Sequence, residues 1–89
     1  MNADVLYGKK ALVCGGSEGI GLASAQALAA LGAEVTLLAR REAPLKAALA
    51  QLSGSHGQHH RTIAADVLSL GDVLPAISEA GFQILINNS

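Results

Sequence analysis

A glycine-rich octapeptide, CGGSEGIG, occupies positions 14–21 and is the part of the sequence best suited to chemistry. It follows a short apolar run and precedes a stretch rich in alanine and leucine, which is typical of a strand turning into a helix. Its glycines have the spacing GxxxGxG, related to the GxGxxG fingerprint of dinucleotide-binding turns. Glycine lets the backbone approach a pyrophosphate closely, and a helix N-terminus offers unpaired N–H groups to an anion. A glycine-rich turn without a ligand is the alternative interpretation.

Two arginines, Arg40 and Arg41, end the next apolar run. A site for NAD places an Asp or Glu about 20 residues beyond the glycines, where its carboxylate accepts hydrogen bonds from the adenosine ribose. Arg40 stands there instead. A guanidinium cannot accept those bonds, but its planar fork suits a 2′-phosphate, so the sequence favours NADP(H) over NAD(H). The alternative is a solvated charge pair at a helix start, although cations there oppose the helix dipole.

The elements that must position these residues alternate along the chain. Four apolar runs predict strands, at Ala11–Cys14, Glu34–Ala39, Arg61–Ala65 and Gln83–Asn87. The stretches between them predict helices, at about 19–31, 42–52 and 72–81. The order βαβαβαβ predicts an α/β fold: an incomplete, Rossmann-type doubly wound parallel sheet with strand order 3-2-1-4 and helices on both faces.

Each of the first two helices is expected to bury one face. For the first helix, which should stop at Gly32, that face comprises Ile20, Ala23, Ala27, Leu28 and Leu31. For the second helix, the face comprises Leu45, Ala48, Leu49 and Leu52.

The composition limits the classes of function. The 89 residues are 51% hydrophobic and 15% charged, with a formal net charge of −1. Such a chain is predicted to fold as part of one domain spanning residues 1–89, and nothing in its charge indicates a nucleic-acid or membrane partner. It has no apolar run long enough to cross a bilayer and no signal-peptide pattern, so we expect a cytoplasmic protein.

The remaining residues with reactive side chains have plainer interpretations. The single cysteine, Cys14, excludes an internal disulfide and is expected to be a buried, inert thiol at the end of a strand. Three histidines, at positions 56, 59 and 60, fall in a polar stretch predicted to be a solvated loop. They have no carboxylate or cysteine nearby in the sequence, so no metal site is predicted.

Four motifs in register carry a family resemblance. They are the glycine turn CGGSEGIG, Arg40, the pair Asp66-Val67 after the third predicted strand, and Ile86-Asn87-Asn88 at the end of the fourth. Together they resemble the N-terminal, cofactor-binding half of a short-chain dehydrogenase/reductase, from about Gly8 onward. The glycine loop is similar to that of members resembling 3-oxoacyl-[acyl-carrier-protein] reductases.

The resemblance implies a role for each matched residue. The pyrophosphate and the nearby ribose would be lined by Gly15, Ser17, Glu18, Gly19, Ile20 and Gly21. Asp66, which on spacing alone is equally a turn or cap residue, would contact the adenine amino group, with Val67 beside the ring. Asn87 and Asn88 correspond to the family's NNAG element on the adenosine side.

Three departures from the family pattern bear on these roles. Cys14 stands where the family usually has Thr, and Ser89 stands where NNAG has Ala. Glu18 occupies a position that is often basic in NADP-dependent members, so the expected phosphate preference rests on Ser17, Arg40 and Arg41.

The family's catalytic Asn, Ser and Tyr-x-x-x-Lys set lies beyond its fourth strand, so no catalytic residue is predicted in residues 1–89. We therefore expect a fragment, inactive alone, of an NADP-dependent oxidoreductase. The complete protein would be a homo-oligomer acting on a small carbonyl or alcohol substrate, such as a 3-oxoacyl thioester. There are two alternatives: a non-catalytic dinucleotide-sensing module, and an inactive fragment that self-associates through strand edges.

Overall fold

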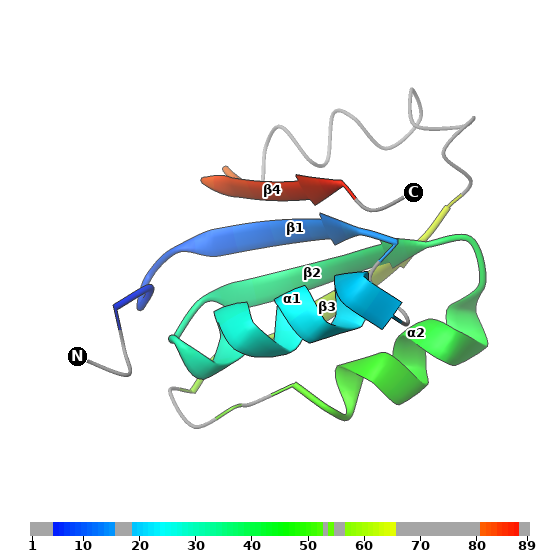
Figure 1. Cartoon of the computed structure of the whole chain (residues 1–89), viewed down its shortest axis with the longest axis horizontal. Helices are drawn as coiled ribbons and strands as arrows, with labels where there is room; N and C mark the ends of the chain where they lie inside the picture. The colour runs from blue at the N-terminus through cyan, green and yellow to red at the C-terminus, as the bar shows by residue number, and fades with distance from the viewer. Residues whose placement is uncertain (1–4, 16–18, 53, 55–56, 66–80, 88–89) are drawn as a thin grey trace.

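The fold is a parallel sheet with helices packed on it (Figure 1). The computed structural model describes residues 5–15, 19–52, 54, 57–65 and 81–87. Its elements are β1 (Lys10–Cys14), α1 (Gly19–Ala30), β2 (Glu34–Ala39), α2 (Glu42–Leu49), β3 (Arg61–Ala64) and β4 (Ile84–Asn87). The strands are parallel, in the order β3-β2-β1-β4, which confirms the predicted Rossmann-type sheet. The third predicted helix, at 72–81, lies outside the described residues except for Gly81.

The two central strands are buried along almost their whole length. Residues 11–14 of β1 and 35–38 of β2 are all buried, and they pair in register from Lys10 with Glu34 to Cys14 with Leu38. Strands covered on both faces carry apolar residues without alternation, which is why both sequences read as continuous apolar runs. The only polar side chain among the buried residues of the described part is that of Thr36, which is 8% exposed.

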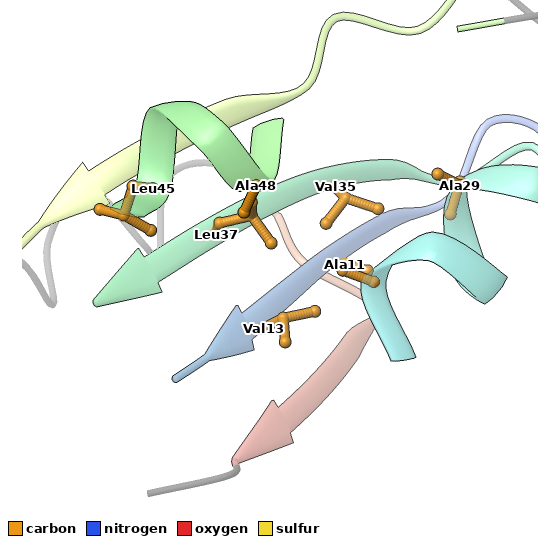
Figure 2. Close-up of a cluster of buried hydrophobic side chains, with 9 residues drawn as sticks. Ala11, Val13, Ala29, Val35, Leu37, Leu45 and Ala48 are labelled. Atoms are coloured by element: carbon orange, nitrogen blue, oxygen red, sulfur yellow. The ribbon is translucent and has the colours of Figure 1, made fainter. Parts of the chain in front are cut away.

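Both described helices cover the same face of the sheet. Figure 2 shows Ala29 of α1 and Leu45 and Ala48 of α2 beside the inward side chains of the central strands, Val35 and Leu37 among them. Because the chain steps from β1 to β2 to β3 in one direction, right-handed crossovers place both connecting helices on one side. Leu12, Cys14 and Leu38 form a second buried cluster on the opposite face.

The predicted buried face of α1 is wrong for three of its five residues, whereas Leu28 packs against the core as predicted. Ile20 is 74% exposed and Ala23 and Ala27 are exposed, whereas the buried residues are Gly21, Ala25 and Ala29. Apolar residues surround this helix on all sides, so hydrophobic periodicity does not single out one face. The smallest residues, spaced four apart, face the sheet because they let the helix backbone pack closely against it.

The second helix buries the predicted face but ends earlier than predicted. Leu45 and Ala48 are fully buried, and Leu52 packs against the same cluster. The helix ends at Leu49, and the N–H groups of Gln51 and Leu52 bond to carbonyls three residues back, at 2.9 and 3.2 Å. The last turn is therefore wound more tightly than an α-helix, as is common at helix ends. Neither described helix is long and apolar enough to cross a membrane.

The predicted stop at Gly32 is confirmed as a Schellman motif. The Gly32 N–H donates to the Ala29 carbonyl and the Ala33 N–H donates to the Leu28 carbonyl, both at 3.0 Å. Gly32 has φ +101°, which only glycine adopts readily. A Cβ atom there would lie 3.0 Å from the Tyr7 backbone nitrogen, so the turn also leaves room for the segment that enters β1.

We expect Gly32→Ala to lower the free energy of unfolding by about 2 kcal/mol or more. The positive φ alone costs an L-residue about 1–2 kcal/mol, and the contact with Tyr7 adds to that cost. Gly81→Ala is the matched control, because Gly81 has φ +69° and open space around its Cβ position. Urea denaturation measures both variants. Equal losses would show that the approach of Tyr7 contributes nothing.

Candidate functional site

The carboxyl ends of the strands form the edge where the sequence places its candidate site. Cys14 at the end of β1 pairs with Leu38 of β2 on one side and with Asn87 of β4 on the other. Because all four strands are parallel, the segments that follow them leave from this same edge. The edge therefore gathers residues that are far apart in the sequence, as the ligand-binding edges of open α/β sheets do.

The glycine turn begins as a continuation of the sheet. The Gly15 N–H donates to the Leu38 carbonyl at 2.7 Å, one residue beyond the end of β1. Gly15 then takes φ +74°, which turns the chain away from the sheet. This hydrogen bond fixes where the turn leaves the sheet relative to the end of β2.

The start of α1 offers open space beside its backbone. Gly19 has φ +63°, and a Cβ atom added there would meet no atom of the described residues within 4 Å, apart from its chain neighbours and the backbone of its own helix. Ile20 next to it is exposed, and Gly21 is buried. The described first turn contains no acidic residue, so no carboxylate in that turn opposes an anion near the unpaired N–H groups.

Two exposed arginines follow β2 at the same edge. Arg41 is the N-cap residue of α2, with φ −115° and ψ 138°, and its side chain makes no capping hydrogen bond. Arg40 precedes it and is also exposed. A cation at a helix N-cap gains nothing from the helix dipole, so the arrangement suits these residues to an external anion more than to helix stability.

The ladder between β2 and β3 also extends one residue beyond β3. The Ala65 N–H donates to the Ala39 carbonyl at 2.8 Å. This bond places Ala65 beside Ala39, the residue that precedes Arg40. The backbone carbonyls of Leu38 and Ala39 thus bind the first residue after β1 and the first residue after β3. The parallel register implies this role, but the side-chain motifs of the sequence do not show it.

Cys14 is 8% exposed, and burial raises the pKa of its thiol by desolvating the thiolate. A thiol that resists ionisation is a poor nucleophile. The predicted inert role of this residue fits its position in the buried cluster with Leu12 and Leu38.

Several predicted site residues lie outside the described part of the chain: Ser17, Glu18, Asp66, Val67 and Asn88. Asn87 is placed through its backbone, as the last residue of β4. The structure brings together Gly15, Gly19, Arg40 and Arg41 at one end of the sheet. A hollow of about 280 Å³, lined by Tyr7, Lys9, Gly32 and Gln58 among others, lies at the opposite, amino end of the strands.

The described residues fit a phosphate-bearing dinucleotide. The space beside Gly19 is a position that any larger side chain would fill, and it adjoins the N-terminus of a helix. The exposed cations at the end of β2 can neutralise a further phosphate at the same edge.

Comparison with known proteins agrees with this geometry. Residues 9–89 match the family model of the short chain dehydrogenases. The 3-dehydrosphinganine reductase TSC10A of Arabidopsis thaliana is 40% identical over 81 residues, covering 90% of this chain and 25% of that protein. The glucose 1-dehydrogenase of Gluconobacter oxydans is 35% identical over 91 residues, covering 97% of this chain and 34% of that protein.

A solved structure shares the fold over the whole chain. The L-sorbose reductase of Gluconobacter frateurii, complexed with NADPH and L-sorbose, superposes with a TM-score of 0.83 at 33% identity and covers 100% of this chain and 35% of that one. The chain thus spans between a quarter and about a third of the length of these relatives. With its glycine turn, its sheet order and a family match over nearly its full length, this chain belongs to the short-chain dehydrogenase/reductase family of oxidoreductases.

Proposed function

We propose that this chain is the NADP(H)-binding portion of an oxidoreductase that interconverts a carbonyl and an alcohol. The observation that carries the proposal is the left-handed, unobstructed backbone at Gly19, which opens α1 at the carboxyl edge of the sheet. This is where a Rossmann-type fold binds a pyrophosphate. Family membership supports the same function.

Each part of the cofactor is assigned to one group of residues. The pyrophosphate and its ribose are bound by the glycine turn: Gly15, Ser17, Glu18, Gly19, Ile20 and Gly21. The adenine is bound by Asp66 and Val67, and Asn87 and Asn88 support the adenosine side. The nicotinamide of the bound cofactor supplies the hydride chemistry, and this chain's own residues bind and orient the other half of the molecule.

The preference for NADP(H) over NAD(H) rests on Arg40 and Arg41. Both are exposed at the end of β2, where an NAD site would have a carboxylate. An arginine contributes two parallel hydrogen bonds and a full charge to a phosphate. The NADPH bound to the L-sorbose reductase is consistent with this choice.

The substrate is proposed only as a class, a small molecule with a carbonyl or alcohol group. By their names, the relatives act on a sphinganine derivative, glucose and L-sorbose, so reduction of a 3-oxoacyl thioester stays a prediction. A homo-oligomeric complete protein and a cytoplasmic location also stay predictions.

Arg40→Asp in the full protein should weaken NADPH binding by about 1.5–3 kcal/mol, the range of a hydrogen bond to a charged group. NADH binding should be unchanged or tighter, because a carboxylate can accept hydrogen bonds from the free ribose. Calorimetric titration measures both cofactors. Arg61→Asp, which removes an equal charge from the amino end of β3, is the control. Equal losses for NADPH and NADH would contradict the assignment.

Gly19→Val should abolish cofactor binding while the fold is retained. The branched side chain would fill the space beside the helix start, and the positive φ would cost about 1–2 kcal/mol of stability. Gly81→Val has the same conformational cost, since its φ is +69° and its surroundings are also open, but it lies at the amino end of β4. Titration with NADPH should separate the two variants. Unchanged affinity in the Gly19 variant would remove the pyrophosphate role.

Residues 1–89 expressed alone should show no NADPH oxidation with 3-oxoacyl, sugar or other ketone substrates. Reduction of a carbonyl needs a proton donor beside it. The only tyrosine, Tyr7, has Ala11 rather than a lysine four residues later. It also lies next to Gly32, at the end of the sheet opposite the glycine turn. A spectrophotometric assay checks this, and measurable turnover would show that the catalytic assignment is wrong.

A further inference from the structure

Residues 57–60, which we call the strap, are bound to the turn between α1 and β2 by their own polar groups. Gln58 Nε2 donates to the carbonyls of Ala29 and Ala33, at 2.7 and 3.0 Å. The His59 backbone N–H donates to Glu34 Oε1 at 3.1 Å. The expectation of a simple solvated loop is therefore wrong for this part of it.

The last contact of the strap is made by an imidazole ring. The Val35 backbone N–H donates to Nδ1 of His60 at 3.0 Å. Val35 is fully buried, and the backbone pairing of β2 with β3 begins one residue later, at Thr36 with Arg61. The ring thus accepts a hydrogen bond from the Val35 N–H at a position of β2 that has no backbone pairing with β3.

This contact depends on the protonation state of the ring. To accept a hydrogen bond at Nδ1, the imidazole must be neutral and carry its proton on Nε2. An imidazolium carries protons on both nitrogens, so it cannot accept at Nδ1 and would face the Val35 N–H with another donor. A buried N–H without an acceptor is unfavourable, so protonation of His60 must work against this arrangement.

Charged residues of both signs lie on the elements at this end of the sheet. Glu34 lies on β2 one residue before Val35, Lys9 and Lys10 lie just before and at the start of β1, and Arg61 follows His60 directly. His59 contributes its backbone to Glu34, and its side chain is exposed. A test of any pH effect on the strap must therefore distinguish His60 from Glu34 and His59.

We propose that His60 is a pH-sensitive catch that holds the start of β3 against β2. With a neutral ring, its Nδ1 accepts the Val35 N–H, and the strap is bound through three of its four residues, Gln58, His59 and His60. With a protonated ring, that contact is lost, while the hydrogen bonds of Gln58 and His59 are kept. Protonation of the ring on acidification then loosens β3, while the pairing of β1 with β2 is kept.

Amide hydrogen exchange in the full protein tests the catch. Between pH 7.5 and 5.5, the protection of the Val35 amide should fall about threefold to tenfold after correction for the intrinsic exchange rate. This is the factor that one intramolecular hydrogen bond contributes. Amides in the pairing of β1 with β2 should keep their protection.

Two matched variants identify the responsible group. In His60→Asn, the side-chain Oδ1 occupies the position of Nδ1 and accepts without titrating, so protection of Val35 should not depend on pH. His59→Asn should behave as the wild type does. If His60→Asn keeps the wild-type pH dependence, or if His59→Asn removes it, the proposal is overturned.

A measurement on the unmodified protein remains decisive if a variant fails to fold. The ¹⁵N shifts of the His60 ring should show the tautomer protonated at Nε2 at pH 7.5, and the Val35 amide shift should follow the titration of that ring. A ring protonated at Nδ1 at pH 7.5, or a Val35 amide that ignores its titration, would overturn the catch.

Discussion

The close packing of α1 against the sheet is the constraint on which the site depends. The buried residues of this helix are Gly21, Ala25 and Ala29, which let its backbone approach β1 and β2 closely, while the larger Leu22 and Leu28 are only partly buried against the same core. The helix begins at Gly19, a few residues after β1 ends at Cys14. Its packing therefore holds the helix start, where first-turn N–H groups have no partner within the helix, at the carboxyl edge of the sheet.

The two ends of the sheet differ in what their hydrogen bonds do. At the carboxyl end, the backbone bonds of Gly15 and Ala65 to β2 fix the positions of two segments while leaving open space beside Gly19. At the amino end, the Schellman turn and the strap satisfy the carbonyls of Leu28, Ala29 and Ala33. Among the described residues, one end therefore has open space beside a helix start, and the other uses polar groups to hold the elements together.

The topology and the edge of the sheet that holds the site could be predicted, because they follow from strong local signals: apolar runs, glycine stops and the right hand of crossovers. The inward face of α1 could not, because size rather than hydrophobicity decides it, and Ile20 is as apolar as any buried residue. The strap was missed for another reason. Gln58 and His60 read as loop residues, and their partners are backbone groups more than two dozen residues away, which no sequence pattern marks.

The order of the strands also bears on how the chain folds. The contact of His60 with β2 joins residues 25 apart, whereas the contact of Lys10 with Gln83, which begins the pairing of β1 with β4, joins residues 73 apart. Closing the longer loop costs about 1 kcal/mol more in chain entropy. The unit formed by β1, α1, β2, α2 and β3 can therefore assemble before β4 docks. In this order, β1, α1 and β2, which flank the glycine turn, are in place before β1 pairs with β4.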